Sequence, residues 1–398
     1  MSHRTLALSF AVLLVSTSAF SLDEASHRSE PLPTAGSRLE QRLIWSLMDV
    51  RAGRLDDALK HVDRLLEAQP DFALAHLVRG DVLSALRQPL AAFGASQTLG
   101  AEIHGLRDEA RARLKRFLRL PPSRTVPADL VLLAPSVQHA LLVDTENYRL
   151  YVFGLEEGVL VRQADYYVSI GKGGNDKRYE GDEKTPTGLY RVASYLPGDS
   201  LPDLYGKGAF PIDYPNGWDR LHGRTGSGIW IHGTESTRYS RPPLSSLGCV
   251  TLSNEDFADL EARVEVGSTP VVLSRGVRWV SADSVTAVGA SVRSALEAWR
   301  RDWESRDTER YLSHYSGSFR TQGMNRQAFA AHKRRVNGSK RFIKVELRDL
   351  AIYGYPGEPA MVAVEFLQHY RSDSFQAQKR KRQYWRFESG RWQIAYEG

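Results

Sequence analysis

The interpretation of this chain depends on two segments, Gly228-Ile-Trp-Ile-His-Gly-Thr234 and Ser245-Ser-Leu-Gly-Cys-Val-Thr-Leu-Ser-Asn254. The first segment is a short apolar strand that ends on His232. The second segment places Cys249 directly after a glycine, which lets a substrate approach the backbone closely. A Ser-Asn-Glu-Asp sequence follows and is typical of a helix N-terminus. The two segments therefore predict a strand-end histidine within reach of a loop cysteine.

A histidine and a cysteine in this arrangement suit nucleophilic catalysis. A base that removes the thiol proton of Cys249 generates the reactive thiolate, and His232 is the candidate base. The backbone N–H groups of Leu247, Gly248 and Cys249 are candidates for an oxyanion hole, where one donor contributes about 3 kcal/mol. The alternative is a buried, inert Cys249 beside a core histidine. The polar, glycine-rich surroundings of Cys249 argue against that alternative.

Composition excludes several other kinds of site. Cys249 is the single cysteine among 398 residues, which excludes an intramolecular disulfide and any multi-cysteine zinc or iron–sulfur site. The formal net charge of +6 is spread along the chain and does not by itself indicate nucleic acid. The length predicts two to three domains.

The N-terminus predicts export. Residues 1–21 resemble a cleaved signal peptide, because Arg4 precedes an apolar run, Leu6–Val15, that is shorter than the about 20 residues needed to span a bilayer. The alternative is an uncleaved anchor. Since no cysteine follows the run and no later segment approaches transmembrane length, we expect neither a lipoprotein anchor nor a stable membrane span. We expect an exported protein, periplasmic or associated with the cell wall.

Residues 36–118 are predicted to form an α-helical domain. Small and helix-ending residues recur there at positions that resemble about two degenerate tetratricopeptide repeats, namely Gly53, Ala58, Pro70, Gly80 and Ala92. A plain helical bundle is the alternative. Two repeats bury little core alone, so we expect them to pack on another domain and to offer a surface for a protein partner.

Residues 131–276 are predicted to form a mainly β domain, because their apolar pattern changes to a period of two. The predicted strands are His139–Asp144, Arg149–Phe153, Val161–Ile170, Gly188–Val192, Gly228–Ile231 and Thr269–Ser274. The first two strands are predicted to form a β-hairpin.

Residues 283–398 are predicted to begin with helices and to end in an antiparallel sheet. An apolar stripe of Val292, Leu296, Trp299 and Trp303 marks the first helix, and Thr308–Tyr315 the second. The predicted strands are Phe342–Leu347, Met361–His369, Lys381–Phe387 and Trp392–Tyr396. This order resembles the α+β NTF2-like cone, a fold whose pocket would here bind a glycan or peptide.

The central motifs resemble a known catalytic family. His232-Gly233, with Ser246-x-Gly248-Cys249 ending 17 residues after the histidine, resembles the signature of the YkuD-type L,D-transpeptidase catalytic domain. Gly181-Asp-Glu-Lys-Thr-Pro-Thr-Gly-Leu-Tyr190 is similar to the family's GD-x-x-TP-x-G-x-Y segment. The resemblance covers roughly 140 of the 398 residues. The chain is thus predicted to be multidomain, with helical repeats, a YkuD-like β domain and an NTF2-like cone.

The resemblance implies a cofactor-free enzyme acting on peptidoglycan stem peptides. Cys249 would attack the L,D peptide bond before the terminal D-residue and form a thioester, with His232 as general base. An amine acceptor would give a crosslink, and water would give a trimmed peptide. Transpeptidation, carboxypeptidation and cleavage of a crosslink or protein attachment all remain open, and family members with NTF2-like tails include trimming enzymes. A catalytically silent wall-binding scaffold is the non-enzymatic alternative, against which the intact Cys249 and His232 argue.

Two positions depart from the family pattern. Leu247 stands where a histidine is usual, and Thr251 stands where arginine or asparagine is frequent. These departures weaken any inference about the acceptor. Besides Leu247, the residues expected to bind the substrate or the oxyanion are Gly248, Ser246, Gly233, His222 and Arg224.

Several other residues carry weaker predictions. His222 and Arg224 are expected to line the cleft, with a loop-structuring pair as the alternative, and Arg220 is expected beside Arg224 to pair with stem-peptide carboxylates. Tyr205 and Trp218 are predicted cleft walls. A zinc site of His222, His232 and Cys249 lacks the short ligand spacing of metal sites, so we expect no metal. Lys379–Arg382 is predicted to be a solvated sheet edge, with a contact to the wall polymer as the alternative.

Overall fold

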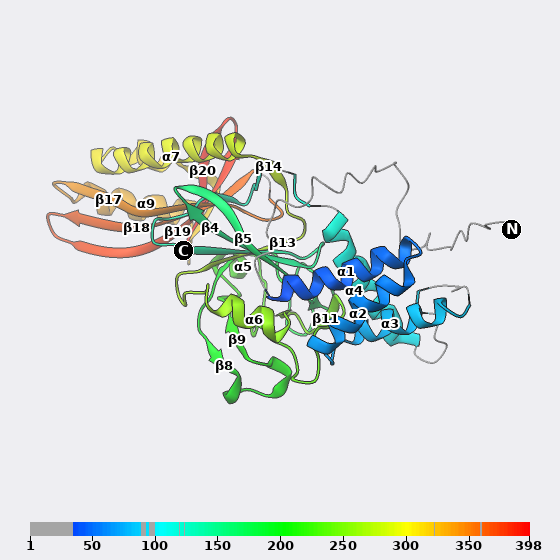
Figure 1. Ribbon diagram of the computed structural model, residues 1–398. Helices are drawn as coiled ribbons and strands as arrows, with labels where there is room; N and C mark the ends of the chain where they lie inside the picture. The colour runs from blue at the N-terminus through cyan, green and yellow to red at the C-terminus, as the bar shows by residue number, and fades with distance from the viewer. Residues whose placement is uncertain are drawn as a thin grey trace.

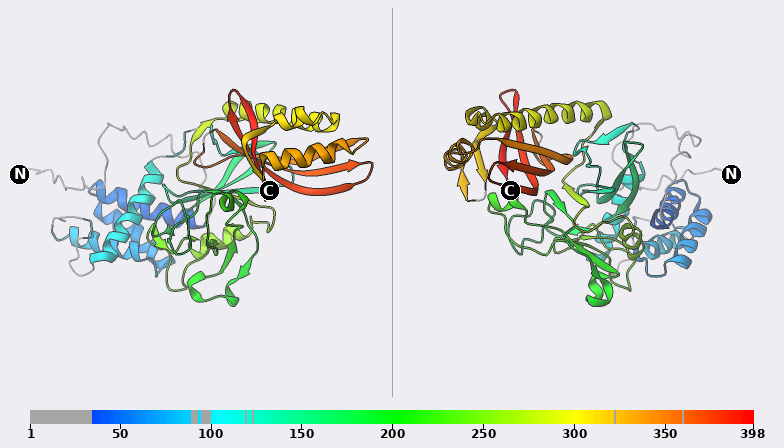
Figure 2. Two further views of the ribbon diagram at one scale, coloured as in Figure 1. Left: turned by 180° about the vertical axis from the view of Figure 1, so that it is seen from behind. Right: turned by 90° about the vertical axis from the view of Figure 1, so that its left-hand side faces the viewer.

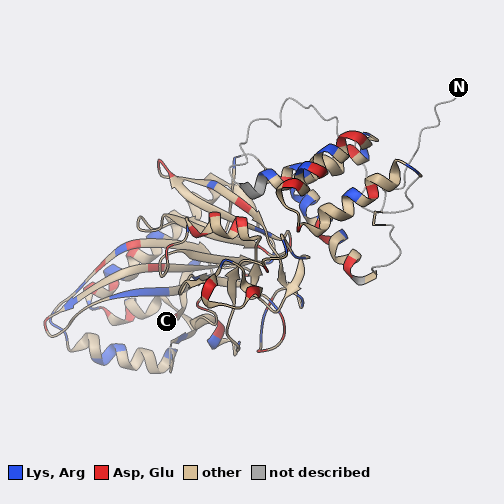
Figure 3. Cartoon of the chain, turned by 60° about the horizontal axis from the view of Figure 1, so that its bottom comes forward, with Lys and Arg blue, Asp and Glu red and all other residues tan. Residues whose placement is uncertain are grey.

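The structure is a computed structural model that describes residues 35–398, except 89–92, 95–99, 119, 123, 322 and 359. The predicted signal peptide and Ala92 lie outside the described residues. The β-rich part of the chain lies between the N-terminal helices and the C-terminal sheet in both views (Figures 1 and 2). Acidic and basic residues are intermixed on the helices and the sheets (Figure 3). No helix in the described part is long and apolar enough to cross a membrane.

The N-terminal helices are α1 (Ala35–Arg51), α2 (Leu55–Ala68), α3 (Ala73–Ala85) and α4 (Gly100–Leu118). Gly53 has a φ of +74° in the turn between α1 and α2, a conformation that favours glycine. Ala58 is fully buried, and its carbonyl accepts a hydrogen bond of 2.8 Å from the Ser46 hydroxyl of α1. Gly53 therefore lies in a turn, and Ala58 lies at a close contact between α1 and α2. The tetratricopeptide assignment stays a prediction.

The β-rich part contains three sheets. The five-stranded sheet has the order β5 (Val159–Tyr167), β4 (Arg149–Glu156), β3 (His139–Asp144), β13 (Pro270–Ser274) and β7 (Gly188–Arg191). The four-stranded sheet has the order β12 (Val250–Thr251), β10 (Trp230–His232), β9 (Gly208–Pro211) and β8 (Leu196–Pro197), and β11 (Leu244–Ser246) pairs with β6 (Ile170–Gly171). The short helices are η2 (Gly198–Ser200), η3 (Asp203–Tyr205), α5 (Gly217–Leu221) and α6 (Asn254–Glu261). The predicted hairpin of β3 and β4 is confirmed.

The C-terminal part covers one face of a sheet with helices. The helices are α7 (Ala282–Ser305), α8 (Thr308–Ser313) and α9 (Arg326–Gly338). The seven-stranded sheet has the order β16 (Met324–Asn325), β15 (Tyr315–Thr321), β20 (Arg391–Glu397), β19 (Gln376–Glu388), β18 (Met361–Ser372), β17 (Ile343–Gly354) and β2 (Leu130–Leu132). A further pair joins β1 (Thr125–Pro127) to β14 (Trp279–Ser281). The predicted stripe of α7 is buried against this sheet.

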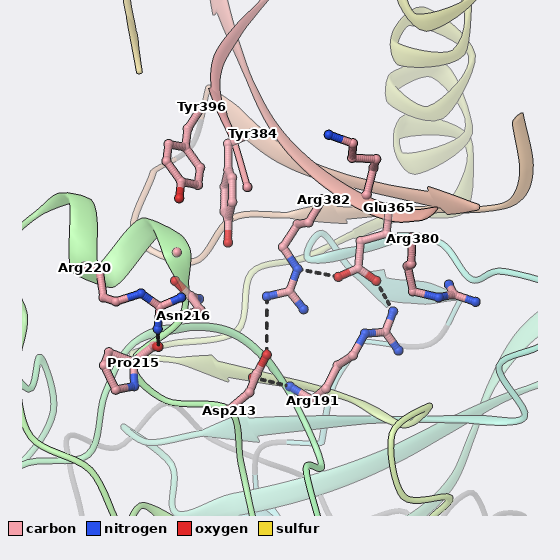
Figure 4. Close-up of a pocket in the computed structure, with 13 residues that line it drawn as sticks. Arg191, Asp213, Pro215, Asn216, Arg220, Glu365, Arg380, Arg382, Tyr384 and Tyr396 are labelled. Carbon is pink, nitrogen blue, oxygen red and sulfur yellow. Dashed lines mark hydrogen bonds and ion pairs between the residues drawn. The ribbon is translucent and has the colours of Figure 1, made fainter. Parts of the chain in front are cut away.

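The opposite face of the C-terminal sheet packs on the β-rich part. Trp218 of α5 is 4% exposed and stacks on Tyr384 at 5.0 Å between ring centroids. Beside this contact, the buried carboxylate of Glu365 is paired with Arg191 and Arg382 at a cavity of about 370 Å³ (Figure 4). The prediction of Trp218 as a cleft wall is therefore wrong, because its ring is part of a domain interface.

The prediction for Lys379–Arg382 is also wrong. These residues belong to β19, an interior strand between β18 and β20. Three of the cations are paired, Arg380 with Asp349, Lys381 with Glu397 and Arg382 with Glu365. A charge run therefore marks a set of ion pairs here, not a solvated edge.

Candidate active site

The pairing of two short strands brings the histidine and the cysteine to one face. Strand β10 runs parallel to β12, with Ile231 opposite Val250 and His232 opposite Thr251. Ile231 and Val250 point into the apolar core. Because side chains alternate between the two faces of a strand, His232 and Cys249 both face away from that core.

The His232 ring is held in one tautomer. Its Nδ1 lies 2.6 Å from the carbonyl oxygen of Gly233, which can only accept a hydrogen bond, so Nδ1 carries the proton and Nε2 has the free lone pair. Nε2 lies 3.3 Å from the Thr251 hydroxyl, and the Tyr205 ring packs at 5.0 Å between ring centroids. Burial lowers the pKa of His232 to about 4, so the ring is a neutral acceptor at neutral pH.

Cys249 is a partly exposed thiol on the same face. Its Sγ donates a hydrogen bond of 3.4 Å to the carbonyl oxygen of Gly228. Burial raises the pKa of this thiol above its ordinary value. The site therefore rests as a neutral thiol and a neutral imidazole, each with another hydrogen-bond partner, and not as a thiolate–imidazolium pair.

The turn before Cys249 requires glycine. Gly248 has a φ of +124°, and a Cβ at this position would lie 2.8 Å from the carbonyl oxygen of Lys184. The Gly248 N–H donates to the Ser246 hydroxyl at 3.1 Å, and that hydroxyl donates to the carbonyl of Cys249 at 2.6 Å. Of the three predicted oxyanion donors, that of Gly248 is thus engaged by Ser246 in the resting structure.

The Gly181–Tyr190 block holds this turn from the other side. The Thr185 hydroxyl donates to the carbonyl of Gly248 at 3.0 Å and accepts from the N–H of Gly171. Upstream, Asp182 accepts hydrogen bonds from Lys177 and from backbone N–H groups of its own loop. The motif of this block resembles the family segment, but it gives no signal for the contact between Thr185 and the turn before Cys249.

Glycine is also required at position 233, because the backbone there approaches the side chain of Asn254 closely. A Cβ there would lie 2.3 Å from Oδ1 of Asn254, at the start of α6. Asn254 accepts from the N–H of Lys207 and donates to the carbonyl of Thr234, so it ties the end of β10 to α6. The Ser253 side chain caps α6 by accepting from the N–H of Asp256, as the sequence indicates. Leu247, two residues before Cys249, is 66% exposed.

His222 and Arg224 have partners within their own region. Arg224 donates to the fully buried Asp219 and to the carbonyl of Thr187, at 3.0 and 3.2 Å. His222 contacts the carbonyl of Trp218 through Nδ1 and packs on that ring at 4.4 Å. These contacts favour the loop-structuring alternative. Arg220, predicted beside them, lines the cavity between the domains (Figure 4).

Of the two predicted cleft walls, only Tyr205 contacts the site, through the rings of His232 and Trp230. Among the described residues, no three His, Cys, Asp or Glu side chains are grouped to hold a metal ion.

Comparisons with known proteins identify two domains of the chain. Residues 138–273 match the model of the L,D-transpeptidase catalytic domain YkuD, and residues 291–398 match that of the Cds6 C-terminal NTF2-like domain. No curated protein matches the chain.

Two solved structures are similar over nearly their full lengths. The structure of Bd1075 from Bdellovibrio bacteriovorus is 29% identical, with a TM-score of 0.60, over 69% of this chain and 97% of its own. The helical cell shape determining protein Pgp2 from Campylobacter jejuni is 26% identical, with a TM-score of 0.57, over 68% of this chain and 95% of its own. The chain therefore contains an L,D-transpeptidase catalytic domain of the YkuD type over residues 138–273, followed by an NTF2-like domain of the Cds6 C-terminal type over residues 291–398.

Proposed function

We propose that the protein is an exported cysteine enzyme that opens an L,D peptide bond in peptidoglycan stem peptides through a thioester on Cys249. The observation that carries this proposal is the shared face of β10 and β12, which presents a tautomer-locked His232 and the Cys249 thiol. The YkuD match supports the substrate class. A scaffold without activity would not need the base fixed in the acceptor tautomer.

The resting geometry favours general-base activation at the moment of attack. Nε2 of His232 takes the proton from Sγ of Cys249 as the sulfur attacks the carbonyl carbon, and backbone N–H groups near Leu247 and Cys249 receive the oxyanion. The imidazolium then gives its proton to the leaving amine as the C–N bond breaks. In the second half-reaction the same nitrogen removes a proton from the acceptor as the acceptor attacks the thioester carbon. The C–S bond breaks, and the Cys249 sulfur takes the proton back from the imidazolium, which restores the resting thiol.

The acceptor decides the product. An amine of a second stem peptide gives a crosslink, which makes the protein an L,D-transpeptidase and is the first candidate. Water gives a trimmed peptide, which makes it an L,D-carboxypeptidase. The NTF2-like match over residues 291–398 favours this second candidate, since family members with such tails include trimming enzymes. The likeness to Pgp2, a helical cell shape determining protein, supports a role in cell shape for either product.

The test is incubation of the purified full chain with tetrapeptide muropeptides, followed by chromatography and mass spectrometry. New dimers indicate transpeptidation, and tripeptides indicate trimming. We expect Cys249→Ala to abolish both products while the circular dichroism spectrum stays unchanged. Full activity of that variant would exclude Cys249 as the nucleophile. We also expect a carbapenem to add covalently to the wild-type thiol and not to the alanine variant, and chelation by EDTA to leave turnover unchanged.

A further inference from the structure

The segment that joins His232 to Cys249 places the side chain of Tyr239 in the core of the N-terminal helices. Tyr239 is 3% exposed and belongs to the apolar cluster of α1–α4. Its ring lies 4.5 Å from that of Phe72, between centroids, and its N–H donates to the carbonyl of Asp71. A catalytic-domain side chain is thus a core residue of the helical domain.

The residue after Tyr239 extends this anchor. The Ser240 hydroxyl donates to the buried carboxylate of Glu109 on α4 at 2.7 Å, and Glu109 is paired with Arg113. The guanidinium of Arg113 also lies 4.0 Å from the ring centroid of Tyr167 on β5. The anchor is therefore fixed to the catalytic sheet as well as to the helices.

Arg241 carries the anchor to the site. It is 7% exposed, and its Nε donates to the Thr234 hydroxyl at 3.1 Å and to Glu235 at 2.9 Å. Its Nη2 donates to the carbonyl of Leu204 at 3.0 Å. The next residue, Tyr205, packs on the His232 ring. Arg241 thus holds both the chain that leaves His232 and the backbone just before Tyr205, whose ring contacts His232.

We propose that Tyr239 and Arg241 are positioning residues through which the N-terminal helical domain orients the His232 base. This inference rests on the proposed function, because the proposed function makes His232 the general base. The helical domain is then part of the active-site framework as well as a neighbouring unit. Buried hydrogen-bonded arginines suit this role, because their planar fork holds several acceptors at once.

The test uses the full chain with Tyr239→Ala and Tyr239→Phe. The alanine variant removes the ring from the helical core, and we expect kcat per folded molecule to fall about tenfold or more with KM nearly unchanged, because misplacement of a reacting group affects turnover. The phenylalanine variant keeps the ring and is expected to restore kcat. Val62→Ala opens a cavity in the same core on α2 and is the matched control, expected to lower Tm but not kcat per folded molecule.

Variants of Arg241 test the protonation of His232 directly. The charged groups that act on His232 are Arg241 and Glu235. The positive charge of Arg241 helps to lower the pKa of His232, so Arg241→Gln is expected to move the acid limb of kcat/KM to higher pH. Arg241→Lys keeps the positive charge but not the planar guanidinium group. We expect it to return the acid limb of kcat/KM to its wild-type pH without restoring kcat.

The His232 ring signal in NMR separates this inference from the proposed function. In the wild type we expect a downfield Nδ1–H signal from the bond to Gly233, which Tyr239→Ala weakens or shifts even if no muropeptide is turned over. An unchanged ring signal in Tyr239→Ala, or wild-type kcat per folded molecule, would overturn the positioning role. An inactive wild type with a shifted signal in the variant would overturn the proposed activity alone.

Discussion

Nε2 of His232 lies 3.3 Å from the hydroxyl oxygen of Thr251, two residues beyond Cys249. Because the ring proton is on Nδ1, the hydroxyl is the donor of this contact. Thr251 therefore occupies the Nε2 lone pair, which is the proposed general base, and it also helps to orient the ring. It stands at a position where the family pattern frequently has a larger polar residue.

We predict that Thr251→Val lowers kcat by about fivefold, the equivalent of one ordinary hydrogen bond, with little change in KM. Valine keeps the shape of threonine and removes only the donor. Steady-state kinetics on muropeptides provides the measurement. A rise in kcat would show instead that the hydroxyl competes with the thiol for Nε2.

The pH dependence of activity should show that Cys249 and His232 react as a neutral thiol and a neutral imidazole. Burial lowers the pKa of His232 to about 4 and raises that of Cys249, so the reactive neutral forms are present together across the neutral range. We predict that kcat/KM falls on the acid side only as the pH approaches about 4. Alkylation of Cys249 by iodoacetamide should keep rising above pH 8. A plateau in the alkylation rate below pH 7 would indicate a preformed thiolate.

His232 also links pH to stability. A folded-state pKa below the unfolded value of about 6.5 means that the unfolded chain binds the proton first as the pH falls. The contribution of His232 to stability is therefore lost between pH 6.5 and about 4. We predict that His232→Asn flattens the pH dependence of the free energy of unfolding in this window, measured by urea denaturation. An identical slope in both proteins would contradict the low pKa.

Thr185 is predicted to act on the nucleophile through the backbone. Thr185→Val removes the donor to the Gly248 carbonyl and the acceptor for the Gly171 N–H, and leaving both groups unpaired costs about 1–3 kcal/mol each. We expect kcat to fall about tenfold, because the turn before Cys249 loosens. Thr187→Val is the control in the same block, since the Thr187 hydroxyl makes no hydrogen bond in the described structure. Equal losses in the two variants would remove the special role of Thr185.

The interface between the domains depends on Glu365. Its pKa is held below the ordinary value because Arg382 and Arg191 outweigh the effect of burial. We predict that Glu365→Gln costs about 3 kcal/mol of unfolding free energy, because two guanidinium groups lose a buried partner. The Glu365 contribution is present above pH of about 4.3 and is lost as the pH falls below it. Glu358→Gln removes a partly exposed pair with Arg386 and should cost less than about 1 kcal/mol. A similar loss in both variants would argue against a special role of burial at Glu365.

The sequence predicted the parts of the structure that local patterns encode. The period of two in His139–Asp144 and Arg149–Phe153 indicated the hairpin, and the apolar stripe of α7 indicated its buried face. The motifs placed Cys249 and His232 on neighbouring elements, as found. Strands β8 and β12 were missed because two residues show no period. Helix α9 was missed because few of its residues are buried.

Other features depend on partners that are distant in sequence. Trp218 reads as an exposed loop aromatic until Tyr384 covers it. Tyr239 reads as an ordinary loop residue until Phe72 meets it. Arg382 appears solvated until Glu365 is placed beside it. In each case the decisive contact crosses a domain boundary, which no local pattern records.

The strand Leu130–Leu132 has a consequence for how the chain folds. It forms an edge of the C-terminal sheet, where Leu132 pairs with Ile352, about 220 residues later. The chain therefore begins that sheet, builds the catalytic domain as an insertion, and then returns to complete it. Closing the loop between Leu132 and Ile352 costs conformational entropy, and the contacts of both domains offset that cost. The two domains are thus expected to unfold in one cooperative transition. A fragment that ends before Ala282 would lack β17, the partner of this strand.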